Sequence, residues 1–351
     1  MHLTNGVSLA ARTTLRIGGP AARMGDLASE EDVVEAVRDT ETRGEPLFVL
    51  GGGSNVVVAD EGFPGLVGRM AIRGIEARTE GDRVVVDVGA GEDWDAFVAR
   101  AVEEGWRGVA SLSGIPGLVG ATPIQNVGAY GEEVADTVAG VRVYDREAAR
   151  YVDMTPSECA FGYRASLFKR RERWIVTRVR FAFARGGDAV VRYAELAKAL
   201  SVKEGDAAPA ARVRETVVAL RRTKGMVLDP ADPESVSAGS FFVNPIVETA
   251  VADRVAAVAG APPPRFDGGP GRVKLAAGWL VERAGFTKGW GEGRAGVSRK
   301  HALALVNRGG ASAGELLAVA RTIRDGVRAR FGVTLEPEPV MVGCSWEEGG
   351  L

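Results

Sequence analysis

The sequence has few of the residues that hold metals or form disulfide frameworks. Among 351 residues there are two cysteines, Cys159 and Cys344, and two histidines, His2 and His301. Two cysteines at this spacing fit neither a zinc site nor a disulfide framework. With so few histidines we expect no protein-ligated metal. We therefore expect reduced thiols and a cytoplasmic protein.

Strong net charge and long apolar runs are also missing. The formal net charge is -2, so no overall basic field attracts nucleic acid. No run reaches the ~20 apolar residues of a membrane helix, and the first 19 residues show no signal peptide. We expect a monomer that binds neither nucleic acid nor membranes. The composition is 46% hydrophobic and 26% charged, which is typical of a globular protein, and the length predicts two or three domains.

Hydrophobic periodicity predicts a mixture of helices and strands. Strands are expected on both sides of the glycine stretch 51–55 and at 82–88 and 174–183. A stripe in residues 92–104 (Trp94, Phe97, Val98, Ala101, Val102) is interpreted as core packing. A loop is expected at 260–271. Helices are expected at 31–43, 92–104, 211–222, 248–259, 274–284 and 313–331.

The stretch GGGSN, residues 51–55, lies between two β-branched or apolar runs. The glycines alone would fit a hairpin turn as well as a phosphate cradle. The loop is longer than a two-residue hairpin needs, and its Ser-Asn end adds a hydroxyl and an amide to the backbone donors. These features favour a nest that binds a pyrophosphate. Because a strand and not a helix follows, the stretch is not a Rossmann fingerprint.

Residues 108–131 carry no charge and contain six glycines and two prolines. The stretch is too broken for a helix, and a long glycine-rich loop usually lies against something. Glycines let the backbone approach a flat ligand, and Gln125, Asn126 and Tyr130 offer hydrogen bonds without charge. The alternative is an internal loop packed by its own side chains.

Four more residues could carry chemistry. Arg164, in FGYRASLFK, could stabilise an oxyanion, although such an arginine more often stacks on a ring or pairs with a carboxylate. Glu336 and Glu338, in LEPEP, should point the same way, and could simply face solvent. Ser240, in SAGSFFVNP, has no histidine close in sequence, which a nucleophilic serine would need.

In this order, the motifs resemble the UDP-N-acetylmuramate dehydrogenase family, also called UDP-N-acetylenolpyruvoylglucosamine reductases. The resemblance covers nearly the whole chain. The tyrosine in VRYAEL is similar to a tyrosine on the mobile substrate loop that one class of this family keeps. The matching stretches are LGGGSNVVV, IPGLVGATPIQNVGAYG, CAFGYRASLFK, RRTKG with a later DP, AGSFFVNP, VKLAAGWL and LEPEP.

The resemblance implies an α/β (α+β) architecture. A two-subdomain FAD-binding fold of the vanillyl-alcohol-oxidase/PCMH type would occupy residues 1–68 and 69–225, and a C-terminal α/β substrate domain residues 226–351. It also implies noncovalent FAD, with NADPH as co-substrate, in peptidoglycan precursor synthesis. NADPH would reduce FAD, and the reduced flavin would give hydride to UDP-N-acetylglucosamine enolpyruvate, forming UDP-N-acetylmuramate.

Roles for single residues also follow from the resemblance. Ser240 would donate the proton, which requires placement but no histidine, while Arg164 and Glu336 would stabilise developing charge. Tyr193, Lys224, Asn244 and Lys274 would bind substrate, although Lys274 could instead be a helix-start lysine facing water. The residues expected to contact FAD are Gly51, Gly52, Gly53, Ser54, Asn55, Ser113, Ile115, Pro116, Gly117, Gly120, Thr122, Gln125, Asn126, Gly128 and Tyr130.

Two loops, 225–236 and 286–300, match the family only loosely. One alternative is another flavin oxidoreductase of the same fold with a different substrate. A second is a noncatalytic nucleotide-sugar sensor, and a third is a hydrolase that uses Ser240, for which a G-x-S-x-G elbow is missing. The joint presence of Arg164, Ser240 and Glu336 favours the reductase.

Overall fold

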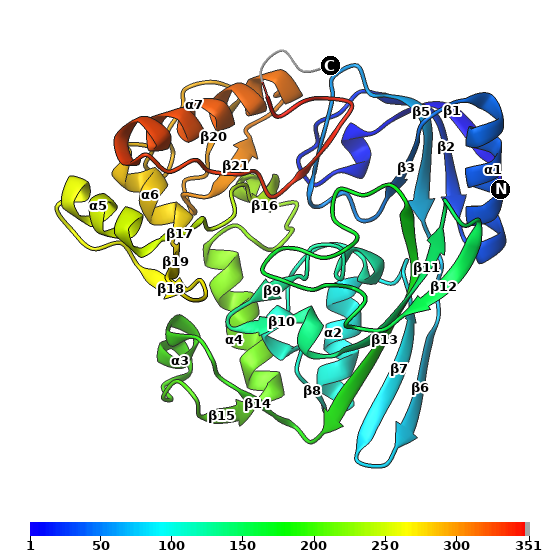
Figure 1. The fold of residues 1–351 in the computed structure, drawn as a ribbon, viewed down its shortest axis with the longest axis horizontal. Coiled ribbons are helices and arrows are strands. Elements are labelled where there is room, and N and C mark those ends of the chain that lie inside the picture. Colours follow the sequence, from blue (N-terminus) through cyan, green and yellow to red (C-terminus); the bar gives the residue numbers. More distant parts are fainter. Residues whose placement is uncertain (348–351) are drawn as a thin grey trace. The chain divides into compact units, whose positions relative to one another are not determined.

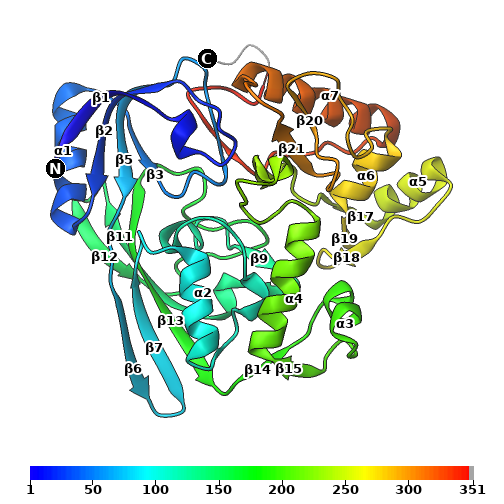
Figure 2. The same ribbon diagram turned by 180° about the vertical axis from the view of Figure 1, so that it is seen from behind.

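A computed structural model describes residues 1–347 and divides the chain into two units, each assembled from several stretches (Figures 1 and 2). The three-part division expected from the sequence is a different partition and stays a prediction. The first unit comprises residues 1–7, 21–53 and 64–227, and the second residues 8–20, 54–63 and the chain from residue 228 onward.

A four-stranded sheet with the order β1-β2-β5-β3 forms one part of the first unit. β3 runs parallel to β5. Helix α1 (Glu30–Arg43) begins at a capping box formed by Ser29 and Asp32 and ends at Gly44, whose φ is 65°. The helix predicted at 31–43 is therefore confirmed. The strands are β1 (Leu3–Ser8), β2 (Pro20–Leu27), β5 (Phe63–Met70) and β3 (Leu47–Leu50).

A six-stranded sheet with the order β12-β11-β13-β7-β6, in which β8 pairs with β13, forms another part. Its neighbouring strands pair antiparallel. The strands predicted at 82–88 and 174–183 are confirmed as β7 and β13. The strands are β12 (Arg150–Met154), β11 (Val138–Asp145), β13 (Trp174–Arg185), β7 (Arg83–Gly89), β6 (Ile75–Glu80) and β8 (Trp106–Arg107).

Aromatic side chains join helix α2 (Trp94–Glu103) to this sheet. The ring centroid of Phe97 lies 5.1 Å from that of Phe181 and 6.1 Å from that of Phe183. The predicted core stripe is confirmed for Trp94, Phe97, Val98 and Ala101, which are buried, whereas Val102 is only half-buried. Helix α2 lies beside α4 (Ala210–Thr223) in both ribbon views.

The remaining elements of the first unit are short. Helices α3 and α4 pack on a separate apolar cluster that includes Leu196, Leu200, Val213 and Val217. Helix α4 confirms the helix predicted at 211–222. The elements are α3 (Ala194–Leu200), the strand pair β9 (Gly128–Ala129) and β10 (Glu132–Glu133), and the pair β14 (Asp188–Val190) and β15 (Ala207–Pro209).

Within the described residues, the second unit contains two three-stranded sheets, one parallel strand pair and three α-helices. The sheets are β16 (Ser237–Ser240), β21 (Ala304–Asn307) and β20 (Ala295–Val297), and β17 (Ile246–Glu248), β19 (Arg272–Leu275) and β18 (Arg265–Asp267). The pair is β4 (Val56–Val58) with β22 (Val340–Val342), and the helices are α5 (Thr249–Ala259), α6 (Ala277–Arg283) and α7 (Ala313–Phe331).

Two sequence predictions need correction here. The loop predicted at 260–271 contains β18, which pairs with β19. The helix predicted at 274–284 begins only at Ala277, because Lys274 belongs to β19. Helices α5 and α7 agree with their predicted positions, and α7 buries the expected face, which consists of Leu316, Ala320, Ile323, Val327 and Phe331.

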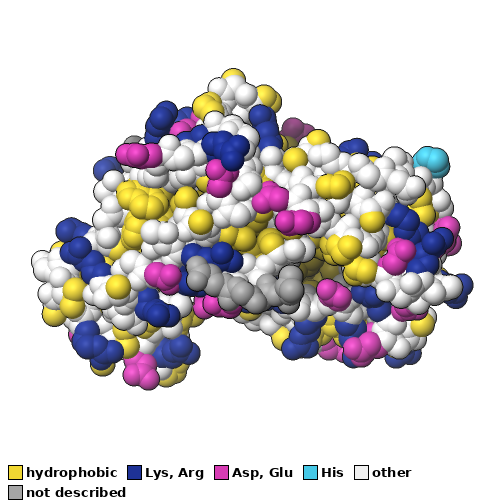
Figure 3. Space-filling model, turned by 90° about the horizontal axis from the view of Figure 1, so that it is seen from above, with side chains coloured by type: hydrophobic (Ala, Val, Ile, Leu, Met, Phe, Trp, Pro, Cys, Tyr) yellow, Lys and Arg dark blue, Asp and Glu magenta, His cyan; other side chains and the backbone are white. Residues whose placement is uncertain are grey.

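The surface mixes both signs of charge. Figure 3 shows Lys and Arg side chains interspersed with Asp and Glu on the face drawn, as the formal net charge of -2 leads one to expect. Within residues 1–347 none of the helices has the length and apolar character needed to cross a membrane.

Arg308 fixes the loosely matching loop before β20 by bonding its main chain. The guanidinium donates to the carbonyl oxygens of Gly289 (2.9 Å), Val297 (3.2 Å), Trp290 (3.3 Å) and Gly291. The planar fork of arginine can serve several acceptors at once, which a lysine ammonium on a flexible stem cannot.

Arg308→Lys should therefore destabilise the protein by about 1–3 kcal/mol, because partly buried carbonyl groups lose their donors. Urea unfolding measures the loss. Arg299→Lys, at an exposed position near the same loop, is the control and should unfold like the wild type. Equal midpoints for Arg308→Lys and the wild type would contradict this account of the loop.

Candidate functional site

The glycine stretch 51–53 is not a hairpin turn. Strand β3 before it pairs with β5, and strand β4 after it pairs with β22. The hairpin alternative is therefore wrong for this loop, while the predicted order of strand, loop and strand is confirmed. Gly53 has a φ of 63°, a backbone conformation that favours glycine.

Two glycine-bearing segments of the first unit touch backbone to backbone. A Cβ atom added at Gly52 would lie 2.8 Å from the Cα atom of Gly117, closer than real contacts allow. Gly117 itself has a φ of 129°. A Cβ atom at Gly51 would meet only the Cβ atom of Ala121, at 3.8 Å. The segments therefore form a backbone-lined cradle that has room beside Gly51.

The uncharged segment 108–131 has little regular structure, as its sequence predicts. It contains two 3₁₀ turns, Ala110–Leu112 and Val119–Ala121, before β9. The buried hydroxyls of Ser113 and Thr122 donate to carbonyl oxygens within the segment, at 2.7 and 2.8 Å. Their oxygen atoms keep lone pairs that can accept from a ligand.

The two ends of this segment are tied together by a buried carboxylate. Glu132 accepts a hydrogen bond from the Ser111 backbone N–H at 2.9 Å. Burial raises the pKa of Glu132. Like Gly52, Gly120 is tightly packed, because a Cβ atom there would lie 2.4 Å from the Cβ atom of Ala90. The segment is thus fixed against the sheet on one side.

Arg164 lies on a tight turn and contacts the glycine-rich segment. Gly162 and Ala165 exchange backbone hydrogen bonds of 3.0 and 3.1 Å, and Arg164 between them has a φ of 50°. Its guanidinium donates to the carbonyl oxygen of Gly128 at 2.5 Å and to that of Asn126 at 3.5 Å. The structure thus brings three of the sequence-predicted site residues together.

The approach of Arg164 depends on glycine at position 128. A Cβ atom there would lie 3.0 Å from the Nη1 atom of Arg164. The Lys169 ammonium supports the turn by donating to the Arg164 carbonyl oxygen at 2.7 Å. The guanidinium also lies 5.3 Å from the ring centroid of Tyr163, so the stacking expected of such an arginine is present as well.

Tyr130, Tyr193 and Lys224 form a cluster in the first unit. The rings of Tyr130 and Tyr193 meet edge to face with 5.6 Å between centroids, and the Lys224 ammonium lies 5.6 Å from the Tyr130 ring centroid. Burial raises the pKa of Tyr130 to about 12, so its hydroxyl stays protonated. An expected FAD-contacting residue thus touches two expected substrate-binding residues.

The sequence reasoning missed two residues of this cluster. Glu195 forms an ion pair with Lys224, with 2.6 Å between Oε2 and Nζ. Arg221 donates to the carbonyl oxygens of Gly114 (3.2 Å) and Met226 (2.8 Å), and burial lowers the pKa of its guanidinium. The cluster of cations in RRTKG could have pointed to Arg221. The single glutamate in VRYAEL, Glu195, has no local sequence feature that points to it.

In the second unit, Ser240 and Glu336 lie on neighbouring chain segments. Ser240 is opposite Ala304 in the sheet. Just after it, Val243 donates to the Glu336 carbonyl oxygen (3.1 Å) and Glu338 donates to the Phe241 carbonyl oxygen (2.8 Å). Burial alternates along LEPEP, with Glu336 and Glu338 on the more exposed side. The prediction that the two carboxylates point the same way is confirmed.

The hydrolase alternative gains nothing from the second histidine. His301 precedes β21, the strand paired with the Ser240 strand, so the fold places its segment nearer to Ser240 than the sequence suggests. Its Nδ1 atom accepts a hydrogen bond from the Leu303 backbone N–H at 3.1 Å. That nitrogen therefore binds the backbone of the turn and not the Ser240 hydroxyl.

Asn244 and Lys274 also belong to the second unit. The Asn244 Oδ1 atom accepts from the Ala277 backbone N–H at 2.9 Å and so binds the start of α6, which leaves its amide hydrogens as donors. Lys274 lies in β19 opposite Ile246, with its ammonium 5.9 Å from the Phe266 ring centroid. The helix-start interpretation of Lys274 is therefore wrong.

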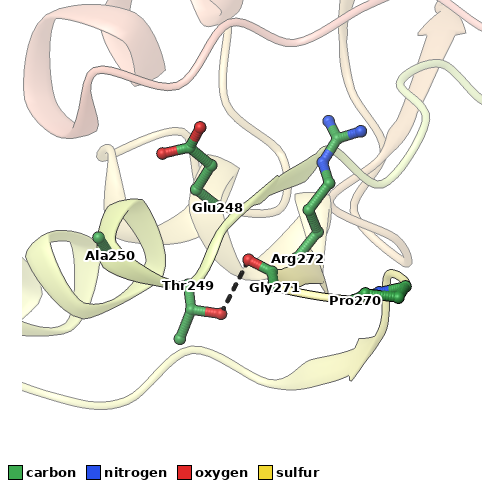
Figure 4. Close-up of a pocket in the computed structure, with 6 residues that line it drawn as sticks. All are labelled: Glu248, Thr249, Ala250, Pro270, Gly271 and Arg272. Carbon is green, nitrogen blue, oxygen red and sulfur yellow. Dashed lines mark hydrogen bonds between the residues drawn. The ribbon is translucent and has the colours of Figure 1, made fainter.

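A separate hollow in the second unit lies between the start of α5 and the chain before β19 (Figure 4). The Thr249 hydroxyl there donates to the Gly271 carbonyl oxygen at 3.2 Å. The residues that line it were not predicted as site residues; they are Glu248, Thr249, Ala250, Pro270, Gly271 and Arg272.

Two family models match the chain. An FAD binding domain matches residues 26–154, and the C-terminal domain of UDP-N-acetylenolpyruvoylglucosamine reductase matches residues 231–342. Together they span parts of both units. The expected FAD contacts from Gly51 to Tyr130 lie within the first match, and Ser240 and Glu336 lie within the second.

Similar proteins cover nearly the full length. The UDP-N-acetylenolpyruvoylglucosamine reductase of Thermobifida fusca is 54% identical over 97% of this chain and 98% of its own. That of Streptomyces coelicolor is 50% identical over 96% of this chain and 89% of its own. The crystal structure of the corresponding reductase from Thermus caldophilus, 26% identical, has a TM-score of 0.67 and covers 97% and 98% of the two chains.

Alanine at Gly52 and at Gly51 should have different effects. Gly52→Ala puts a Cβ atom against Gly117 and should lower the stability of the FAD-free protein by about 1–3 kcal/mol. Gly51→Ala has room for its Cβ atom, so it should leave that stability unchanged and weaken FAD binding. Thermal unfolding without FAD and a fluorescence titration with FAD measure the two effects. Unchanged FAD affinity in Gly51→Ala would show that the cradle beside Gly51 does not hold the cofactor.

Proposed function

This chain belongs to the UDP-N-acetylenolpyruvoylglucosamine reductase family, and we propose that it reduces UDP-N-acetylglucosamine enolpyruvate to UDP-N-acetylmuramate with FAD and NADPH. The observation that carries the proposal is the contact between the Arg164 guanidinium and the Gly128 carbonyl oxygen. It joins a permanent cation to the segment expected to hold a flavin.

The residues present fit FAD. The Gly51–Gly53 loop and the segment from Ser113 to Tyr130 supply backbone donors, two buried hydroxyls and space beside Gly51. No histidine or cysteine lies in either stretch, so we expect noncovalent binding. When bound, FAD supplies hydride transfer.

The chain's own residues would manage the proton and the charge. We propose that the Ser240 hydroxyl gives its proton to the carbon next to the one that receives hydride, because proton delivery to a basic carbon needs placement and no histidine. Arg164 would stabilise negative charge on the substrate carboxylate as it develops. Glu336, on the exposed side of its segment, would assist Ser240 through a hydrogen bond to the enol form.

Four residues would bind the substrate, namely Tyr193, Lys224, Asn244 and Lys274. Lys224 supplies a cation for the diphosphate, beside the ring of Tyr130. Asn244 has free amide donors, and Lys274 a second ammonium. We also propose that the protein is a monomer and that it acts in the cytoplasm, where NADPH and a nucleotide sugar are both available.

Two alternatives to the reductase make different predictions. A flavin oxidoreductase with another substrate would share the cradle, and a sensor would bind the nucleotide sugar without turnover. An anaerobic absorption experiment separates them from the reductase. Flavin bands should bleach with NADPH and return when the enolpyruvyl sugar nucleotide is added. Bands that stay bleached would leave the flavin site but exclude the proposed substrate.

Ser240→Ala should keep flavin reduction by NADPH and slow the return of the flavin bands by about 10²- to 10⁴-fold, the usual contribution of a placed acid. Stopped-flow absorbance follows both steps. Ser157→Ala, at an exposed position of the first unit, is the control and should reoxidise at close to the wild-type rate. Wild-type reoxidation by Ser240→Ala would exclude Ser240 as the proton donor.

Glu195→Gln should tighten UDP binding at low salt by up to about fivefold. The ion pair that it removes is partly exposed, with 28% and 39% of the two side chains accessible, and such pairs contribute about 1 kcal/mol or less. Removing the carboxylate leaves the Lys224 charge for the diphosphate. Calorimetric titration measures the affinity. Glu204→Gln, an exposed substitution with the same charge change, is the control. Weaker UDP binding by Glu195→Gln would show that the ion pair positions Lys224 for the ligand.

A further inference from the structure

The Asn126 side chain is buried and bonded through all of its polar hydrogens. Its residue is 1% exposed. The Nδ2 atom donates to the Glu133 Oε2 atom at 2.7 Å and to the Gly162 carbonyl oxygen at 3.1 Å. The Oδ1 atom accepts from the Ala135 backbone N–H at 3.0 Å. One amide therefore joins its own segment to two others.

This network reaches Arg164 from two directions. Through Gly162, the amide holds the first residue of the turn that carries Arg164. Through its own main-chain carbonyl, Asn126 accepts a hydrogen bond from the guanidinium at 3.5 Å, beside the stronger bond to Gly128. Asn126 thus contacts both the backbone turn that carries Arg164 and the charged end of its side chain.

We propose that Asn126 is a positioning residue for Arg164, an inference that rests on the proposed function. Both amide hydrogens are used within the protein, so the contact with FAD expected of Asn126 is left to its backbone. The role needs a side chain that donates twice and accepts once at a backbone φ of 46°, which asparagine tolerates better than most residues. Asparagine meets both needs.

Arg164 requires such support because of its own conformation. Its φ of 50° is unfavourable for a residue with a side chain and persists only where the surroundings fix it. A displacement of about 1 Å in a group that acts on the reacting atoms can slow a reaction by about 10²-fold. Loss of the Asn126 amide should therefore affect the step that uses Arg164 and spare the step that does not.

Three variants test this assignment. Asn126→Gly keeps the positive φ and removes the amide. Asn126→Asp places a carboxylate against the Glu133 carboxylate. The double variant Asn126→Asp with Glu133→Gln restores that hydrogen bond with donor and acceptor exchanged. All are compared with the wild type and with Glu133→Gln alone, in the FAD-loaded protein.

We expect wild-type FAD affinity and wild-type bleaching by NADPH in all variants. Reoxidation by the enolpyruvyl sugar nucleotide should fall about 10²-fold in Asn126→Gly and Asn126→Asp. The exchanged pair should stay slow, because an aspartate at this position still cannot donate to the Gly162 carbonyl oxygen. Combined with Arg164→Lys, Asn126→Gly should add little further loss, because both changes act on one group.

Other outcomes overturn the assignment. Loss of FAD affinity, or equal slowing of both steps, would place Asn126 in the cofactor site or in general stability. Full additivity with Arg164→Lys, or wild-type reoxidation by the exchanged pair, would also reject it. A wild-type protein whose bleached flavin is not reoxidised by the sugar nucleotide would instead refute the proposed function, and this inference with it.

Discussion

The close contact between the backbones at Gly52 and Gly117 is the constraint on which the site of the first unit depends. Two main chains can approach this closely only where neither carries a side chain at the contact. The segment that continues from Gly117 packs at Gly120 against Ala90 and then reaches Gly128, whose carbonyl oxygen binds Arg164. The cradle and the position of the cation are therefore properties of one stretch of backbone.

Three arginines described above donate to neutral groups. Arg164, Arg221 and Arg308 all donate to main-chain carbonyl oxygens. A carbonyl dipole fixes a guanidinium without cancelling its charge, so the cation can still act on an anionic ligand. Lys224 differs, because its partner Glu195 is itself charged and must share the lysine with any diphosphate.

Much of the fold could be predicted from local patterns. Helices α1 and α7 have capping boxes and apolar faces that are visible in the sequence, and β7 and β13 are rich in β-branched or aromatic residues. The glycine segments and Arg164 were found because their composition is unusual. Pairing across the chain could not be predicted, since neither the Glu195 partner of Lys224 nor the Glu133 partner of Asn126 carries a local signal. Lys274 was misassigned because a short strand ends two residues before a helix begins.

The construction of the second unit from distant stretches has a consequence for synthesis on the ribosome. Asn55, just before β4, and Glu338, just before β22, are joined by a hydrogen bond across 283 residues. At translation rates of about 5–20 residues per second, β4 waits roughly 15 to 60 s for its partner strand to emerge. During that time the nascent chain presents an unpaired β-branched edge, which is a binding site for chaperones and a point of risk for aggregation. The order of synthesis thus makes β22 the strand that completes a pairing begun much earlier by β4.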